Sequence, residues 1–346
     1  MKVSNRLQNL RQRLAENGLD GILVSQPENR YYLSGFDGSA GFLLITATDI
    51  ILATDFRYTE QAREQAPDYE IFQITSNNVA AWLPGLLADL NLERLGFEAE
   101  HVTFAIYRQL TEALNKAQSQ VKLIPVDGLV ESLRAIKGPE EIELITKAVE
   151  ISDSAVEYIN DVIHIGMSEK EAAWEIEKFM REKGSQSLPF DIIVASGPNA
   201  ALPHAKPSSR AIQSGEPVII DIGARVSGYS SDLTRTIYLG AHNNTFNKVY
   251  DIVLGAQLTA LATIGEGMTG QEADSLARVV IEEAGYGEAF GHGLGHGIGL
   301  APHELPRLGP NSSENLVDGM VFTIEPGIYP VSYTHLRAHE TSLHLV

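Results

Sequence analysis

The sequence predicts two domains: an α/β N-terminal domain and an α+β C-terminal domain with an internal duplication about a pseudo-twofold axis. Three observations support this prediction. The chain has 346 residues, which is more than one hydrophobic core usually organises. Short apolar runs alternate with helical patterns up to about Pro125. Beyond that point, a set of helix-start signals occurs twice at a constant offset of 101 residues (267 − 166 = 101; 285 − 184 = 101).

The N-terminal domain is expected over residues 1–127. Its predicted strands are Gly21–Val24, Ile50–Ala53, Tyr69–Phe72 and Leu95–Phe97, and its predicted helices are Thr59–Glu64, Asn78–Leu90 and Thr103–Ala117. His101 is the single histidine of this part of the sequence, and no carboxylates cluster there at ligand spacing. We therefore expect this domain to contribute shape and partner contacts rather than chemistry.

A linker is expected over residues 128–138, and the second domain over residues 139–330. Pro139 suits the first turn of a helix, where its missing N–H costs nothing. Apolar side chains then recur at steps of three and four residues and predict one buried face of a long helix: Leu144, Ala148, Ile151, Ala155, Tyr158 and Val162.

The duplicated signals each predict an amphipathic helix. A hydroxyl residue opens each helix, a glutamate follows three residues later as in a capping box, and a glycine ends the pattern. The two sets are Ser168, Glu171 and Gly184, and Thr269, Glu272 and Gly285. Two similar halves would pack around a pseudo-twofold axis, and a site at their junction would draw residues from both.

Two aspartates flank a predicted hairpin in the first half. The apolar run Val218–Ile220 leads into Asp221, and Asp232 precedes a second strand at Thr234–Leu239. A symmetric hairpin would place the aspartates directly opposite each other, with their Cβ atoms about 4.5–5.5 Å apart. Carboxylates this close repel unless they are protonated or bridged by cations. Alternatively, one aspartate caps the turn and the other is exposed.

The second half contains a run of alternating glycines and other residues with two histidines, His292 and His296. Glycine lets a strand approach a site closely. His303 follows, and an apolar strand at Met320–Ile324 leads into Glu325. A glutamate at the end of a buried strand can equally be structural, held in a salt bridge.

The ordered set Asp221, Asp232, His296 and Glu325, together with residues 133–141, resembles the pita-bread metallopeptidases, which include methionine aminopeptidase, aminopeptidase P, prolidase and the non-peptidase creatinase. Residues 38–42 (Gly-Ser-Ala-Gly-Phe) and 55–58 (Asp-Phe-Arg-Tyr) resemble the creatinase-like N-terminal domain of the proline-directed members. The resemblance reaches to about Pro330. It implies a creatinase-like domain followed by a pita-bread catalytic domain.

The resemblance also implies roles for particular residues. Asp221, Asp232, His296 and Glu325 would bind metal, with Glu325 also moving a proton, and His204, His292 and His303 would bind substrate and intermediate. An oxygen-rich set with one imidazole suits two divalent ions, manganese or cobalt best.

The implied function is metal-dependent hydrolysis of N-terminal Xaa-Pro bonds by a Xaa-Pro aminopeptidase, with a Xaa-Pro dipeptidase (prolidase) as the alternative. The expected substrates are peptides with proline at the second position, and a homodimer is expected. A creatinase-type hydrolase is disfavoured, because creatinase works without metal.

The family pattern breaks after Pro330. The family supplies a further bridging glutamate from an Arg-x-Glu strand, but here Arg337 is followed by His339 at the ligand position, and Glu340 comes one residue late. A histidine cannot bridge two ions as a carboxylate does. We expect the segment 331–346 to lack a closing strand and to be a non-native end. A catalytically impaired pita-bread binding protein is therefore a further alternative.

Composition argues against several other classes of function. A formal net charge of −19 disfavours a nucleic-acid partner. The absence of cysteine excludes disulfides, thiolate catalysis and cysteine-bound zinc. No apolar run approaches the length of about 18 residues that a membrane span needs, and no secretory signal is visible. The expected location is the cytoplasm.

Overall fold

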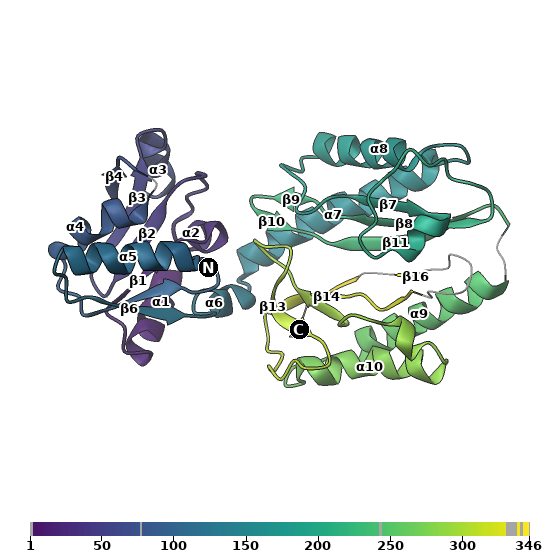
Figure 1. Ribbon diagram of the computed structural model, residues 1–346. Helices are drawn as coiled ribbons and strands as arrows, with labels where there is room; N and C mark the ends of the chain where they lie inside the picture. Colours follow the sequence, from purple (N-terminus) through teal and green to yellow (C-terminus); the bar gives the residue numbers. More distant parts are fainter. Residues whose placement is uncertain (1–2, 77, 242–243, 330–337, 340–341, 346) are drawn as a thin grey trace. The chain divides into compact units, whose positions relative to one another are not determined.

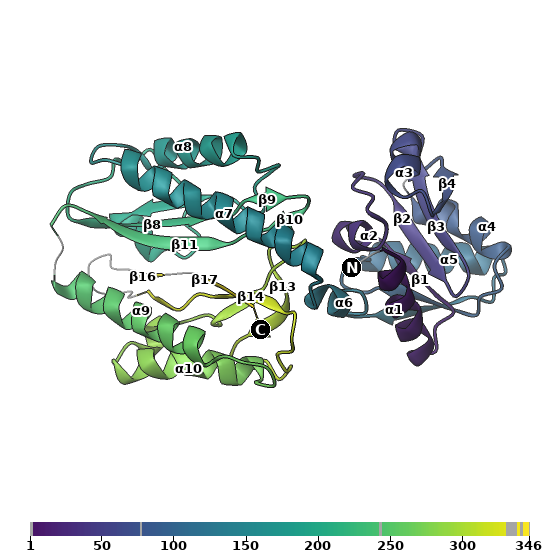
Figure 2. The same ribbon diagram turned by 180° about the vertical axis from the view of Figure 1, so that it is seen from behind.

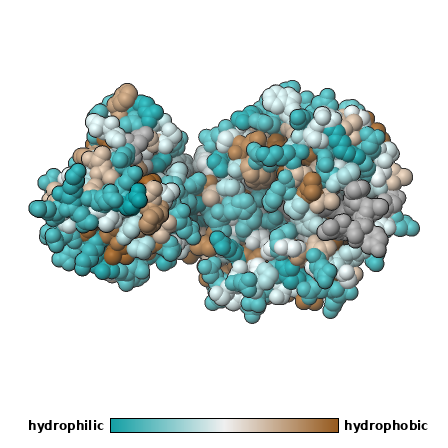
Figure 3. Space-filling model, viewed as in Figure 1, coloured by the Kyte–Doolittle hydropathy of each residue, from teal (hydrophilic) through white to brown (hydrophobic). Residues whose placement is uncertain are grey.

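The computed structural model describes residues 3–76, 78–241, 244–329, 338–339 and 342–345. The chain divides into two compact units, Met1–Arg134 and Ala135–Val346. None of the helices in these described ranges is long and apolar enough to cross a membrane. Figure 3 shows mainly hydrophilic side chains on the visible face, with apolar side chains gathered in small patches.

The N-terminal unit is built on one mixed sheet with the strand order β4-β3-β2-β1-β5-β6 (Figure 1). The strands are β1 (Gly21–Val24), β2 (Phe42–Thr46), β3 (Ile50–Asp55), β4 (Glu70–Ile74), β5 (Arg94–Glu98) and β6 (Lys122–Val126). The helices are α1 (Val3–Glu16), α2 (Pro27–Ser34), α3 (Thr59–Gln65), α4 (Leu83–Ala88), α5 (Phe104–Lys116) and α6 (Glu131–Ala135). All four predicted strands are present.

The single helix predicted at Asn78–Leu90 is wrong. The structure has a 3-10 turn at Val79–Ala81 and then α4, with Trp82 between them in a non-helical conformation. Pro84 explains the break, because proline lacks an N–H and is tolerated in the first turn of a helix but not inside one.

In its described residues the second unit has two larger sheets, each covered by a pair of helices (Figure 2), and two small two-stranded sheets, β10-β9 and β15-β16. In its first half α7 (Pro139–Val162) and α8 (Glu169–Glu182) pack on the sheet β11-β8-β7, and in its second half α9 (Asn244–Thr263) and α10 (Gly270–Glu283) pack on the sheet β13-β12-β14-β17. The strands of the first half are β7 (Ile193–Ser196), β8 (Glu216–Ile222), β9 (Arg225–Val226), β10 (Tyr229–Ser230) and β11 (Leu233–Leu239). The strands of the second half are β12 (Gly295–Gly297), β13 (Glu304–Leu308), β14 (Val321–Ile324), β15 (Gly327–Ile328), β16 (Ala338–His339) and β17 (Ser342–Leu345).

The internal duplication is confirmed by equivalent hydrogen bonds. Both capping boxes form, at the first residues of α8 and α10. Just before α8, Gly166 N donates to Ile212 O, and just before α10, Gly267 N donates to Leu316 O. The donors are 101 residues apart (267 − 166) and the acceptors 104 (316 − 212). The two halves therefore share one framework.

The predicted pairing of Asp221 with Asp232 is wrong by two residues. Asp221 pairs with Thr234, and the same register places Asp232 opposite Gly223. The turn sets this register, because Ser227 and Gly228 both have positive φ, 47° and 84°, as a two-residue type I′ turn requires. That turn is centred one residue later than the midpoint between the aspartates. A shift of two residues keeps both side chains on one face of the hairpin.

β17 adds a fourth strand to the larger sheet of the second half, contrary to the expectation that a closing strand is missing. β17 pairs with β14 from Val321↔Leu345 to Ile324↔Ser342, and β16 pairs with β15 through Gly327↔His339. Arg337, Glu340 and the side chain of His339 lie outside the described residues.

Candidate functional site

Three predicted ligands converge in the second unit. One ligand atom from each of Asp232, His296 and Glu325 lies within 4.8 Å of the others. His296 Nε2 is 3.1 Å from Glu325 Oε1 and 3.6 Å from Asp232 Oδ2. Asp232 comes from the first half of the unit and the other two come from the second, so the group lies where the halves meet.

Glycines allow β12 to bring His296 to this point. A Cβ atom added at Gly295 would lie 2.0 Å from Thr323 O, and one added at Gly297 would lie 2.0 Å from Leu305 O. β12 can therefore lie between β13 and β14 only because these residues lack side chains. The Thr323 hydroxyl, two residues before Glu325, donates a hydrogen bond to Glu325 Oε1 and fixes that carboxylate.

Asp221 is close to the same group without belonging to it. It lines the same pocket, and its charge contributes to raising the pKa of Asp232. The duplication explains its position, because an offset of 104 takes Asp221 to Glu325 and Gly223 to Gly327. In the second half, His339 pairs with Gly327. His339 therefore occupies the position in the second half that Asp232, opposite Gly223, occupies in the first.

The site holds more negative charge than it can stabilise by itself. Burial raises the pKa of Asp232 well above 3.8, and the charges of Asp221 and Glu325 raise it further. Burial lowers the pKa of His296, but the hydrogen bond and charge of Glu325, with the charge of Asp232, bring it to about 9. Crowded carboxylates around one imidazole are what bound cations would neutralise. These residues therefore fit a divalent-metal site.

All seven predicted site residues line one pocket of about 810 Å³: His204, Asp221, Asp232, His292, His296, His303 and Glu325. The ring centroids of His296 and His303 are 4.2 Å apart. Burial lowers the pKa of His303, and the nearby His296 lowers it further. Neutral His303 can donate or accept a hydrogen bond but carries no charge near pH 7.

Tyr329 also lines this pocket and was not predicted from the sequence. His292 Nδ1 is 2.7 Å from Gly293 O, and His292 Nε2 is 2.8 Å from the Tyr329 hydroxyl. A carbonyl only accepts, so Nδ1 carries the proton, and in the neutral ring Nε2 accepts from Tyr329. The signal in the sequence was an aromatic residue four positions after Glu325.

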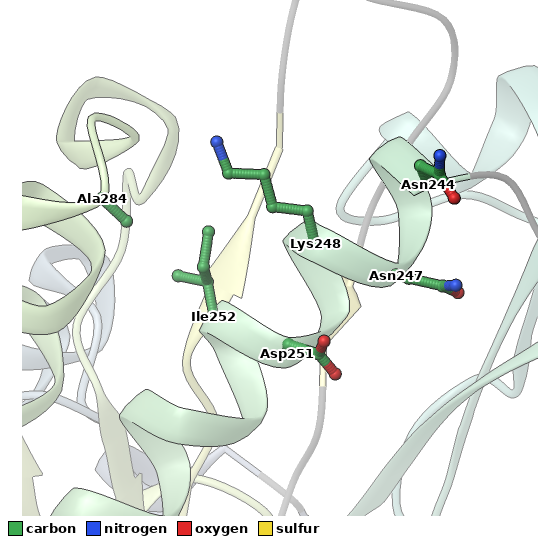
Figure 4. A pocket seen from close by; sticks show the side chains of 6 residues that line it. All are labelled: Asn244, Asn247, Lys248, Asp251, Ile252 and Ala284. Carbon is green, nitrogen blue, oxygen red and sulfur yellow. The ribbon is translucent and has the colours of Figure 1, made fainter.

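A second hollow, in the described part of the second unit, lacks such a donor set. The hollow in Figure 4 has a volume of about 630 Å³ and is lined by five residues of α9 and by Ala284, with one carboxylate, Asp251, and no histidine. It offers no group of side chains that could hold a metal.

Two family models match the chain. Residues 6–136 match the creatinase/prolidase N-terminal domain, and residues 143–342 match metallopeptidase family M24.

Individual relatives extend these matches. A curated Xaa-Pro dipeptidase of Pyrococcus furiosus is 36% identical over 99% of this chain and 95% of its own length. A solved structure described as Xaa-Pro dipeptidase from Bacillus anthracis is 41% identical, covers 100% of this chain and 95% of that one, and has a TM-score of 0.94. A solved X-Pro aminopeptidase from Thermotoga maritima is 37% identical, covers 97% and 94% of the two chains, and has a TM-score of 0.87.

Proposed function

Because this chain belongs to metallopeptidase family M24, we propose that it is a Xaa-Pro dipeptidase, a metallo-exopeptidase that hydrolyses dipeptides ending in proline. The observation that carries the proposal is the convergence of Asp232, His296 and Glu325 in a pocket that also holds three further histidines.

The dipeptidase is preferred to the aminopeptidase that the sequence alone put first. The curated relative and the solved structure with the higher TM-score are both described as Xaa-Pro dipeptidases. The aminopeptidase of Thermotoga maritima is similar over nearly the same length, so the shared fold does not separate the two activities. Longer peptides must be excluded by features around the pocket mouth.

We assign Asp221, Asp232, His296 and Glu325 as ligands of two divalent ions, with manganese or cobalt preferred. Support comes from the oxygen-rich donor set and from the raised pKa values of Asp232 and His296, both of which must lose their protons to act as ligands. When bound, such ions supply a water that deprotonates near neutral pH and polarise the scissile carbonyl.

The protein's own residues then handle the peptide. His303, whose ring lies beside that of His296, donates a hydrogen bond to the developing oxyanion. Glu325 passes a proton to the departing proline nitrogen, which needs one to leave as a neutral amine. His204 and His292 bind the substrate, and Tyr329 holds His292 in the tautomer described above.

The test compares purified chain on an Ala-Pro dipeptide and on an Ala-Pro-Ala tripeptide, each with excess manganese. A higher kcat/KM for the dipeptide supports the proposal, and a clear preference for the tripeptide returns the assignment to the aminopeptidase. Metal analysis separates the remaining alternative, since a catalytically impaired binding protein would hold no tightly bound ion. Light scattering on the same sample tests the proposed homodimer.

A further inference from the structure

We propose that Lys137 is a positioning residue that holds His303 in place through a buried ion pair with Glu304, an inference that rests on the function proposed above. Lys137 Nζ is 2.9 Å from Glu304 Oε1, and the two side chains are 1% and 4% exposed. Nζ also donates to Ala135 O at 3.2 Å. Because both side chains are buried, the two opposite charges stabilise each other.

Glu304 closes the turn that carries His303. It follows His303 directly and begins β13. Its Oε2 accepts a hydrogen bond from Ala301 N at 3.4 Å. A Cβ atom at Gly299 would lie 2.3 Å from Glu304 Oε1, so the turn closes tightly around this carboxylate. A shift of the carboxylate would therefore move the backbone from which the His303 ring projects.

Lys137 is fixed independently to the strand that leads to Glu325. Its N–H donates to Gly319 O at 2.8 Å, and the preceding residue, Ile136, forms a bridge with Met320 immediately before β14. The ion pair thus joins the turn that carries His303 to the strand that carries Glu325. In the proposed mechanism, His303 donates a hydrogen bond to the oxyanion and Glu325 protonates the leaving nitrogen.

The same chain offers a matched control. Lys147 and Glu143 on α7 form an ion pair at 2.7 Å, but their side chains are 52% and 67% exposed. Exposed pairs of this kind contribute little to stability and hold no fixed geometry. Lys147→Met therefore repeats the chemical change of Lys137→Met away from the site.

The experiment uses the full chain with excess manganese and compares Lys137→Met, Glu304→Gln, the double variant Lys137→Met/Glu304→Gln, Lys137→Arg and the Lys147→Met control. It measures kcat and KM on Ala-Pro, the melting temperature, and amide hydrogen exchange of residues 299–304.

Both single variants should lower kcat by about 10- to 100-fold with a smaller change in KM, as loss of a supporting partner typically does. Exchange at residues 299–304 should accelerate, Lys137→Arg should recover part of kcat, and Lys147→Met should match the parent.

The double variant separates positioning from stability. It leaves no lone buried charge, so its melting temperature should recover toward the parent's while kcat stays low. Recovery of kcat together with the melting temperature would overturn the proposal, since the pair would then matter only for stability. If the parent hydrolyses no Xaa-Pro substrate, the proposed function fails, and the exchange data decide alone: unchanged exchange in Lys137→Met refutes the role of Lys137, and faster exchange supports it.

Discussion

Raising the pH should destabilise the metal-free protein, because the folded site holds the proton on His296 more tightly than the unfolded chain does. Burial lowers the pKa of His296, but Glu325 and Asp232 outweigh burial and bring it from 6.5 to about 9. A group whose pKa is raised on folding stabilises the protein fully below its unfolded pKa, and that stability is lost as the pH rises through the folded pKa. The window therefore runs from pH 6.5 to about pH 9.

The size of the effect follows from that interval. The difference between 6.5 and about 9 corresponds to on the order of 3 kcal/mol of unfolding free energy. For a domain of about 150–250 residues this lowers the melting temperature by roughly 6–12 °C. The raised pKa of Asp232 adds a loss of the same sign that begins at lower pH.

The assay is thermal unfolding of chelator-treated protein between pH 6.5 and pH 9 at constant ionic strength, followed by circular dichroism. His296→Asn is the control, because it has no proton to lose in this range. Added manganese should reverse this loss of stability at high pH, because manganese binds His296 only after the imidazolium has lost its proton. The apparent affinity for manganese should therefore rise about tenfold per pH unit below pH 9. Equal loss of stability in the parent and in His296→Asn would refute the reasoning.

Three further outcomes are expected. Asp232→Asn should abolish Xaa-Pro hydrolysis while leaving the circular dichroism spectrum unchanged, because it removes a ligand charge rather than packing; retained activity with manganese or cobalt would contradict the ligand assignment. Thr269→Ala removes the hydroxyl that accepts from Glu272 N at 3.2 Å and should cost about 1 kcal/mol in urea unfolding, whereas an unchanged midpoint would mean that the cap contributes nothing. Tyr329→Phe removes the hydrogen bond to His292 and should lower kcat/KM about 2- to 10-fold, and an unchanged pH–rate profile and kcat/KM would dismiss that contact.

Structural features that depend on only a few neighbouring residues were predictable from the sequence. The capping boxes at Ser168 and Thr269 satisfy N–H groups within one turn of helix, so their pattern survives any tertiary arrangement. The apolar strand before Glu325 and the glycines around His296 likewise mark close packing locally. Together with the family resemblance, these local patterns singled out Asp232, His296 and Glu325, which the structure brings together.

The hairpin register was not predictable from spacing alone. It depends on Ser227 adopting a positive φ, which a serine rarely does. The symmetric assumption chose the wrong centre, and only the backbone conformation of the turn corrects it.

Contacts between distant segments leave no periodic signal at all. Lys137 and Glu304 are 167 residues apart (304 − 137 = 167). From the sequence alone, neither residue can be distinguished from a charged residue on the surface. The short helix α2 was not predicted from the sequence, because its eight residues form too small an apolar face to give a clear helical pattern.

The two halves of the second unit differ in one respect that gives the pocket a direction. A twofold arrangement of the positions of Asp221 and Glu325 would present the same carboxylates to either end of a bound peptide. The histidines break that equivalence: an offset of 101 takes His292, His296 and His303 to Asp191, Ala195 and Leu202, none of which is a histidine. Of the four histidines that line the pocket, three come from the second half and one, His204, comes from the first. A peptide in the pocket would therefore meet unequal numbers of imidazoles from the two halves, and this inequality would let a site built from a duplicated frame tell the amino end of a peptide from the carboxyl end.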